Sequence, residues 1–324
     1  MTQPTACRTV PRRTVLLGGA AFAAGLATPA LRAQATTKVV YGYSAVSDFA
    51  SVFVAADEGF FTKRGLELEP KFIPLNPTIV PGIESGSLQM GGPTPSGYLQ
   101  SVDGGLDHVV LGGGGVFSKT FTEIALVARA GAGIRKAQDC IGKKIGVPGL
   151  GALLHVTFRQ WLKLNGVDWK QVNFVEAPFP QHADLIRGGS VDAVVTAGPF
   201  LLRIVDSGAG YVAAYYTTFL PEGNPTILHV AKREWATQNP AAVKAFREGI
   251  QEATAFILQP KNDARVRELL AKYLKVPAPV AAKMQISPPA PVVTVKQLKW
   301  WVDIMNEQGM LKAAPALDKL IFKA

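Results

Sequence analysis

The sequence predicts an α/β protein with two lobes, each a mostly parallel sheet flanked by helices. Short runs rich in β-branched and aromatic residues alternate with amphipathic runs at helical spacing, which is the pattern of parallel strands joined by helices. This series of strand-helix-strand units stops near residue 130 and then begins again. The chain after residue 35, about 289 residues long, also exceeds the usual size of one hydrophobic core. Two sheets are therefore expected.

Residues 1–35 have the layout of an export signal. Arg12 and Arg13 precede a weakly apolar run at 15–31, and residues 1–35 contain no acidic side chain. Ala33-Gln34-Ala35 is the small-x-small pattern that a signal peptidase reads, so cleavage is expected near Ala35. The arginine pair resembles a twin-arginine signal, but Pro11 stands where Ser or Thr is usual, so the general secretory route stays open. Glycine and proline within the run argue against a membrane anchor.

The expected first lobe begins with three strands, each followed by a helix. The strands are short β-branched, aromatic or alternating runs, and the helices begin at polar caps. Asn76-Pro77 and Thr94-Pro95 also place proline in the first helical position. We expect strands at 38–43, 66–69 and 88–91, and helices beginning near 47, 76 and 94.

The expected second lobe repeats this arrangement. An apolar strand at 123–129 leads into it, and the chain is expected to return through a strand at 226–230 and then to be helical to its end. Asn239-Pro240 starts a long amphipathic helix. Within the second lobe we expect strands at 144–147, 172–176 and 191–196, and helices near 152–165, 183–187 and from Pro199.

No catalytic or metal-binding pattern is present. The sequence has no Gly-x-Ser-x-Gly, no phosphate loop ending in Gly-Lys-Ser/Thr and no His-Glu-x-x-His. His108, His155, His182 and His229 are scattered without the spacing of metal ligands. Cys140 is the only cysteine after residue 35, so no internal disulfide or cysteine metal site is expected, and it is interpreted as a core thiol. No cofactor and no metal are predicted.

The charge distribution argues against nucleic acid as a partner. The formal net charge is +10, and the expected cleavage removes four arginines and leaves +6. These charges are spread thinly, with no basic run longer than Lys143-Lys144 and no aromatic platform. The glycine run at 112–115 lacks the spacing of a dinucleotide fingerprint and is interpreted as a flexible turn.

One local arrangement recurs: a strand end, a loop of small residues, then a helix start. It occurs at 44–48, 91–95, 149–152 and 197–199, twice in each half of the chain. In an open α/β sheet such loops line the crevice at the carboxyl ends of the strands, where ligands bind. Free N–H groups at helix starts attract polar or anionic groups, and small residues allow close approach. For any single loop, Gly and Pro that merely punctuate the fold remain the simpler explanation.

Several segments resemble a known family. Residues 57–69, Asp-Glu-Gly-Phe-Phe-Thr-Lys-Arg-Gly-Leu-Glu-Leu-Glu, look like the GFF-x-K-x-GL-x-V-E stretch of type II solute-binding proteins of the nitrate, taurine and sulfonate group. The resemblance continues, in family order, over nearly the whole chain after the signal. It is carried further by residues 83–91, 142–148, 186–193, 301–303 and 308–312.

This resemblance implies a type II periplasmic-binding-protein fold, with a two-strand hinge that closes on a ligand. The first lobe would comprise 36–127 and 223–324, the second 128–222, with crossings near 122–129 and 224–230. Such a protein is a monomer in the periplasm that binds a small molecule without catalysis and delivers it to the membrane permease of an ABC importer. The implied ligand is a small organic anion of the sulfonate, nitrate or carboxylate kind, with aromatic acids included.

The resemblance also implies the positions that contact the ligand. His155 could donate to the ligand or could face neighbouring side chains, and both remain open. Ala197-Gly198 stand where many relatives carry an aromatic or acidic residue, which leaves either a roomier pocket or a polar anchor elsewhere. The pocket loops hold no Arg or Lys, so an anion would depend on backbone N–H groups and hydroxyls. The implied contacts are Ser44, Asp48, Thr94, Gly149, Gly151, Ala152, His155 and Asn224.

Two alternatives come from other functional classes. A thiamine-pyrimidine synthase has the same fold, but that enzyme group carries a cysteine-rich motif that Cys140 alone cannot supply, and the export signal also argues against it. A ligand sensor that presents its closed form to a membrane receptor kinase is not distinguished from a transport protein by the sequence.

Overall fold

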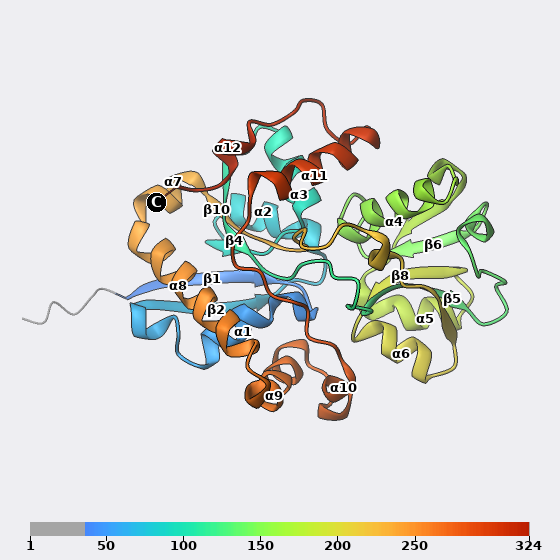
Figure 1. The fold of residues 1–324 in the computed structure, drawn as a ribbon, viewed down its shortest axis with the longest axis horizontal. Helices are drawn as coiled ribbons and strands as arrows, with labels where there is room; N and C mark the ends of the chain where they lie inside the picture. The colour runs from blue at the N-terminus through green and yellow to red at the C-terminus, as the bar shows by residue number, and fades with distance from the viewer. Residues whose placement is uncertain (1–35, 324) are drawn as a thin grey trace, which may run out of the picture. The chain divides into compact units, whose positions relative to one another are not determined.

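The structure is a computed structural model that describes residues 36–323. The expected export signal, with its cleavage site at Ala35, lies outside the described residues. The described chain forms two five-stranded sheets flanked by helices (Figure 1), which confirms the predicted two-lobed α/β fold. Within 36–323, no helix is both long enough and apolar enough to cross a membrane.

The first sheet has the order β2-β1-β3-β10-β4. β1 runs parallel to β2 and β3, whereas β10 runs antiparallel to both β3 and β4. Leu66 and Leu68 are buried and Glu67 and Glu69 are exposed, so the alternation seen in the sequence becomes one core face and one solvent face of β2. The strands are β1 (Thr37–Tyr43), β2 (Leu66–Phe72), β3 (Met90–Gly91), β4 (His108–Gly113) and β10 (Leu228–Lys232).

The second sheet has the order β7-β6-β8-β5-β9. β6 pairs in parallel with β7 and β8, and β5 is antiparallel to β8 and β9. Each sheet is therefore mostly parallel with a single antiparallel strand. Neither β4 nor β9 is among the strands predicted from the sequence. The strands are β5 (Ile124–Arg129), β6 (Lys144–Val147), β7 (Asn173–Glu176), β8 (Ala193–Ala197) and β9 (Gly210–Ala214).

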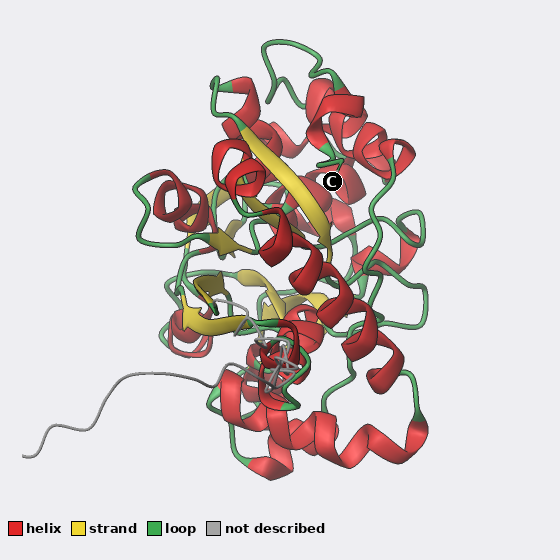
Figure 2. Cartoon of the chain, turned by 90° about the vertical axis from the view of Figure 1, so that its left-hand side faces the viewer, coloured by secondary structure: helices red, strands yellow, loops and turns green. Residues whose placement is uncertain are grey.

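Helices cover the faces of both sheets (Figure 2). Those of the first sheet are α1 (Ala50–Asp57), α2 (Ile79–Glu84), α3 (Pro95–Asp103), α7 (Arg233–Gln238), α8 (Pro240–Ile257), α9 (Asp263–Leu274), α10 (Ala278–Lys283), α11 (Val295–Glu307) and α12 (Leu317–Leu320). Those of the second are α4 (Leu153–Leu164), α5 (His182–Arg187) and α6 (Phe200–Asp206). Short 3-10 turns precede several of them, among them η1 (Ser47–Phe49) and η3 (Asn76–Thr78).

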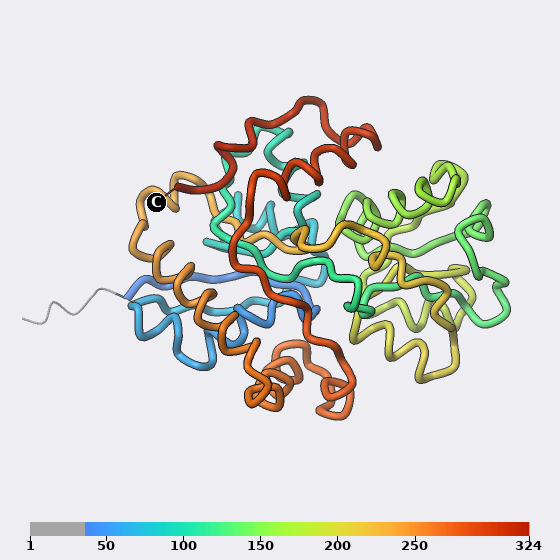
Figure 3. Tube along the Cα trace, viewed as in Figure 1, coloured from blue at the N-terminus to red at the C-terminus, as the bar shows by residue number. Residues whose placement is uncertain are grey.

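The last part of the chain returns to the first sheet. In Figure 3 the orange segment that contains α8 runs beside the blue β1–α1 segment, and α8 packs on α1. The ring of Phe246 on α8 stacks on Phe61 with centroids 5.5 Å apart. Near the C-terminus, the N–H of Phe322 donates to the carbonyl of Val110 on β4 at 3.0 Å. The first lobe is therefore built from both ends of the described chain.

The two lobes are connected by two crossing segments that pair with each other. Between β4 and β5, the N–H of Phe117 donates to the carbonyl of Asn224 at 3.0 Å, and the N–H of Thr226 donates to the carbonyl of Gly115 at 2.8 Å. These bonds form the two-strand hinge. The first crossing lies before Ile124, because β5 pairs with β8 from Ile124 onward and with β9 from Leu126 onward. The expected boundary between 127 and 128 falls inside this strand and should move to before residue 124.

The glycine run at 112–115 is not the flexible turn predicted from the sequence. All four residues are buried, and the first two belong to β4. A Cβ on Gly113 would lie 2.6 Å from the carbonyl oxygen of Ala290, and one on Gly114 would lie 2.8 Å from that of Asp48. The glycines are needed because separate backbone segments approach here more closely than a side chain would allow.

Candidate functional site

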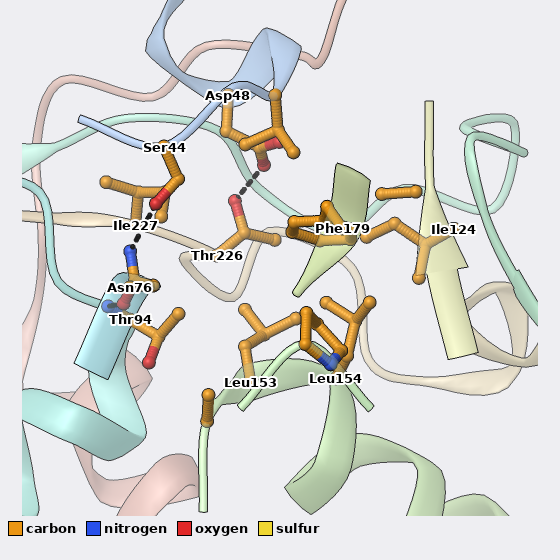
Figure 4. Close-up of a pocket in the computed structure, with 14 residues that line it drawn as sticks. Ser44, Asp48, Asn76, Thr94, Ile124, Leu153, Leu154, Phe179, Thr226 and Ile227 are labelled. Atoms are coloured by element: carbon orange, nitrogen blue, oxygen red, sulfur yellow. Dashed lines mark hydrogen bonds between the residues drawn. The ribbon is translucent and has the colours of Figure 1, made fainter. Parts of the chain in front are cut away.

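A partly open pocket lies between the two sheets, at the carboxyl ends of their strands (Figure 4). Its enclosed volume is about 50 Å³, and about 540 Å³ of free space is present when its open mouth is included. We call it the interlobe pocket. It is lined by Ser44, Val46, Asp48, Asn76, Thr94, Ile124, Pro148, Ala152, Leu153, Leu154, Phe179, Ala197, Thr226 and Ile227.

Four of the residues expected at the site line this pocket. Ser44 and Asp48 follow β1, Thr94 follows β3 and Ala152 follows β6. Ser44, Thr94 and Ala152 lie in loops between a strand end and a helix start, the recurring arrangement seen in the sequence, and Asp48 lies in the short turn η1 that precedes α1. The placement agrees with the general rule that ligands of open α/β sheets bind where parallel strands end. Their contact with a ligand remains a prediction.

Asn76 ties the first-lobe loops together. Its Nδ2 donates to Ser44 Oγ at 3.3 Å and to the carbonyl of Gly92 at 3.0 Å, and its Oδ1 accepts from the N–H of Thr94 at 2.9 Å. From the sequence, this residue is predicted only as a helix start. The amide side chain instead fixes the loop after β1 against the loop after β3, and so sets the position of Ser44 and Thr94 in the pocket wall.

Thr94 is the N-cap of α3 as well as part of the pocket wall. Its Oγ1 accepts from the N–H of Gly97 at 3.3 Å and lies 3.3 Å from Ser96 Oγ. This is the cap-then-proline helix start predicted from Thr94-Pro95.

We expect Thr94→Leu to weaken ligand binding while unfolding remains cooperative. The substitution removes a pocket hydroxyl and a cap whose loss costs about 1 kcal/mol, too little to unfold a domain of this size. Binding is measured by calorimetry and cooperativity by denaturant unfolding. Thr94→Ser keeps the hydroxyl and serves as the control. Unchanged affinity in Thr94→Leu would remove Thr94 from the site.

Asp48 is the one ionisable side chain in the pocket wall. Its Oδ1 accepts hydrogen bonds from Thr226 Oγ1 and, at 3.2 Å, from Ser287 Oγ, and only 8% of the residue is exposed. Burial raises the pKa of this carboxyl, and the hydrogen bonds from Thr226 and Ser287 lower it again in part. We call Asp48, Thr226, Ser287 and Gly115 the Asp48 cluster, because a Cβ on Gly115 would meet all three side chains.

The other four expected residues lie outside the pocket wall. His155 Nδ1 accepts from the N–H of Gly151 at 2.8 Å, and its ring packs on Phe174 at 4.6 Å between centroids. Burial, together with Arg159, lowers the pKa of His155 to about 3, so the ring is neutral. The ring packs on neighbouring side chains in this structure, and its contact with a ligand remains a prediction. Asn224 lies in the hinge, where its carbonyl accepts from Phe117.

Gly149 and Gly151 lie where the second lobe meets the first. A Cβ on Gly149 would lie 2.9 Å from Pro77 Cγ, and one on Gly151 would lie 3.2 Å from the side-chain amide of Gln100. Gly151 also has a φ of +78°, which favours glycine. These glycines permit close contact between the lobes at the edge of the pocket, and their contact with a ligand remains a prediction.

Most of the pocket wall consists of apolar side chains that are not among the contacts predicted from the sequence. Leu153 and Leu154 begin α4, Ile124 begins β5, and Phe179 stacks on Phe200 with centroids 5.1 Å apart. Apolar residues next to strand ends were a weak signal, since most such residues enter the core. No Lys, Arg or His is among the lining residues.

The space beside Gly198 is filled by the carboxylate of Glu123. A Cβ on Gly198 would overlap Glu123 Oε2, and the N–H of Gly198 donates to the carbonyl of Glu123 at 2.8 Å. Glu123 Oε1 accepts from the N–H of Gln285 at 2.8 Å, whereas Oε2 is buried without a partner among the described residues. The missing side chain at position 198 therefore leaves no void there, because the acidic side chain of the residue before β5 fills the space.

The described residues offer no evident metal site. Among residues 36–323, no group of three or more His, Cys, Asp or Glu side chains could hold a metal ion. Cys140 is buried, and burial raises the pKa of its thiol to about 12, which suits a core residue.

Comparison with known proteins places these features in a family. Residues 32–271 match the NMT1-like family. The nitrate/nitrite binding protein NrtA of Synechococcus elongatus is 26% identical over 268 residues, which cover 73% of this chain and 59% of that protein. A putative binding protein of Brucella abortus is 25% identical over 224 residues, covering 69% of this chain and 67% of the relative. The chain thus spans about 59% of the length of the nitrate-binding relative.

Solved structures share the fold. The alkanesulfonate-binding protein SsuA from Xanthomonas axonopodis pv. citri, bound to MOPS, has a TM-score of 0.75 at 17% identity, covering 90% of this chain and 99% of that one. The periplasmic nitrate-binding protein NrtA from Synechocystis PCC 6803 has a TM-score of 0.72 at 16% identity, covering 89% of this chain and 86% of that one. The fold is therefore that of periplasmic binding proteins.

Proposed function

The chain belongs to the NMT1-like family, and from this premise we propose that it is the extracytoplasmic solute-binding component of an ABC importer. It captures a small organic molecule in the interlobe pocket and presents it to a membrane permease. The observation that carries the proposal is the pocket itself, which lies between the sheets and takes its wall from both lobes and from the return crossing at Thr226 and Ile227. Its single ionisable side chain, Asp48, supports binding without catalysis.

Hinge closure is the proposed capture step. Opening would have to break contacts between the lobes on either side of the pocket. Gln308 Nε2 on the first lobe donates to the carbonyl of Val156 on α4 at 2.9 Å, and exposed ion pairs join Lys163 to Glu307 at 2.8 Å and Lys283 to Asp206 at 3.1 Å. Exposed ion pairs contribute little free energy, so these contacts suit a closure that a ligand can stabilise and thermal motion can reverse.

The lining favours an organic ligand with an apolar body over a small inorganic anion. Similar proteins include nitrate/nitrite binding and alkanesulfonate-binding proteins, and the resemblance implies an anion. Among the described residues the lining contains no basic side chain, and its one ionisable group, Asp48, repels an anion when it is ionised. The leucines of α4 and the ring of Phe179 offer dispersion contacts instead.

We expect one chemical class in a ligand panel to raise the thermal unfolding midpoint. The panel holds alkyl sulfonates, taurine, nitrate, aromatic carboxylates, pyrimidines, amino acids and aromatic amines. A ligand at 100 times its dissociation constant stabilises the native state by about 2.7 kcal/mol. For a chain of this length that moves the midpoint by an amount on the order of 5 °C.

A variant with a blocked pocket shows where the ligand binds. Ala152→Phe places a ring in the wall of the pocket, and Ala264→Phe makes the same change at an exposed position of α9. The midpoint shift should disappear in the first variant and persist in the second. A shift that survives Ala152→Phe, or no shift with any class, would contradict solute capture in this pocket.

A further inference from the structure

The charge of Asp48 has no counterpart in the pocket. Among residues 36–323 no Lys, Arg or His lines the pocket, and Asp48 takes part in no ion pair. The contrast with Asp57 is clear, because that carboxylate is paired with Lys272 at 2.7 Å and accepts a hydrogen bond from Tyr273. Buried carboxylates are normally paired, so an unpaired one in the wall of a binding pocket points to a partner that arrives with the ligand.

The two carboxylate oxygens of Asp48 have different surroundings. Oδ1 is held by the hydroxyls of Thr226 and Ser287, which fixes the orientation of the group. Oδ2 receives no hydrogen bond from another described residue, and it is not among the fully enclosed polar atoms without a partner. Since Asp48 lines the cavity, Oδ2 is the oxygen that is available to a ligand.

Resting on the proposed function, we propose that the ligand of the interlobe pocket is a small nitrogen base with an apolar body, and that its N–H group donates to Asp48 Oδ2. Ammonium, amidinium and amino-heteroaromatic groups share this chemistry. A hydrogen bond between a cationic donor and a carboxylate is among the strongest that proteins form. Such a donor also brings the positive charge that the pocket wall lacks. Nitrate, and sulfonates or carboxylates that carry no N–H group, cannot make this contact.

The rest of the wall fits the apolar body of such a molecule. Leu153, Leu154 and Ile124 provide aliphatic surface, and the ring of Phe179 is held in place by its stacking on Phe200. The hydroxyls of Ser44 and Thr94 supply hydrogen-bonding groups elsewhere on the first-lobe side. The wall therefore has one anionic anchor, neutral hydroxyls and a large apolar surface.

The test compares matched ligands that differ in one functional group. Benzylamine, benzamidine, benzyl alcohol, benzoate and benzylsulfonate are titrated by calorimetry into the full chain and into Asp48→Asn. Asparagine retains an Oδ1 that accepts from Thr226 and Ser287, so the cluster and the fold should persist. We expect the two bases to bind the native chain most tightly and to lose about 10- to 100-fold in affinity in Asp48→Asn.

Two control variants separate this inference from the proposed function. Asp318→Asn removes a carboxylate at an exposed position and should leave all affinities unchanged. Tighter binding of benzoate or benzylsulfonate than of the bases, or an unchanged affinity for the bases in Asp48→Asn, would overturn the inference. The proposed function would still stand if Ala152→Phe abolished that binding. Binding of none of the five compounds would overturn the inference and leave the proposed function to the wider ligand panel, whereas binding that Ala152→Phe leaves intact would overturn both.

Discussion

Gly115→Ala is expected to lower the free energy of unfolding by about 3 kcal/mol and to weaken ligand binding in the same variant. A Cβ at this position would overlap Ser287 Oγ and would lie 2.5 Å from Asp48 Oδ1 and 3.0 Å from Thr226 Oγ1. These groups are buried and bonded to one another, so none can retreat without breaking the cluster. Gly115 also donates its N–H to the carbonyl of Asp48 at 3.1 Å, which keeps the hinge backbone against the cluster.

Denaturant unfolding measures the effect, with the midpoint and the slope reported separately so that a change in stability is distinguished from a change in compactness. Gly97→Ala is the matched control. Its Cβ would meet only Thr94 Oγ1 at 3.4 Å, an ordinary contact, and alanine favours the interior of α3, so this variant should be as stable as the native chain or slightly more stable. A Gly115→Ala variant as stable as the control would show that the cluster can rearrange.

The fold could be predicted because its signals are local. The alternation of apolar and acidic residues at 66–69 depends only on which face of a strand meets the core, and these residues lie in β2. The pair Thr94-Pro95 carries its own cap and its own fixed φ, and it became the start of α3. β4 was missed because its last residues, Gly112 and Gly113, have little strand propensity and are selected by backbone contacts with Pro291 and Ala290.

The site could be predicted only in part, because its groups are far apart in the sequence. Asp48 was selected from a loop signal, but its partners Thr226 and Ser287 lie 178 and 239 residues away, and no local pattern marks them. His155 shows the opposite case. It follows a glycine loop, as a ligand contact would, yet its ring turns back to accept from Gly151. The direction of a side chain at a helix start depends on packing that neighbouring residues do not encode.

The surroundings of Gly198 also depend on a residue that is distant in the sequence. From the sequence, Ala197-Gly198 permitted either a roomier pocket or a polar anchor elsewhere. Ala197 lines the interlobe pocket, whereas the carboxylate of Glu123 lies where a Cβ on Gly198 would be. Burial raises the pKa of Glu123, and the hydrogen bond from Gln285 and the charge of Arg267 lower it in part. Glu123 and Gly198 therefore form one packing unit at the junction of β5 and β8.

Gly198→Ala is accordingly expected to lower the free energy of unfolding by about 2 kcal/mol, and Glu123→Ala to restore most of that loss. The added methyl group must displace a carboxylate that the N–H of Gln285 holds in place. A double-mutant cycle measures the coupling, which should reach at least about 1 kcal/mol because the two residues share one space.

The pH dependence of the same cycle identifies the group that is displaced. A carboxyl whose pKa is raised by folding contributes stability below its unfolded pKa and loses that contribution as the pH rises through the raised value. Removing Glu123 should therefore lower the free energy of unfolding least, or raise it most, at pH values above the raised pKa. The Gly198→Ala variant keeps this titrating carboxyl. Additive effects of the two substitutions at every pH would contradict the contact, because residues that do not share space change the stability independently.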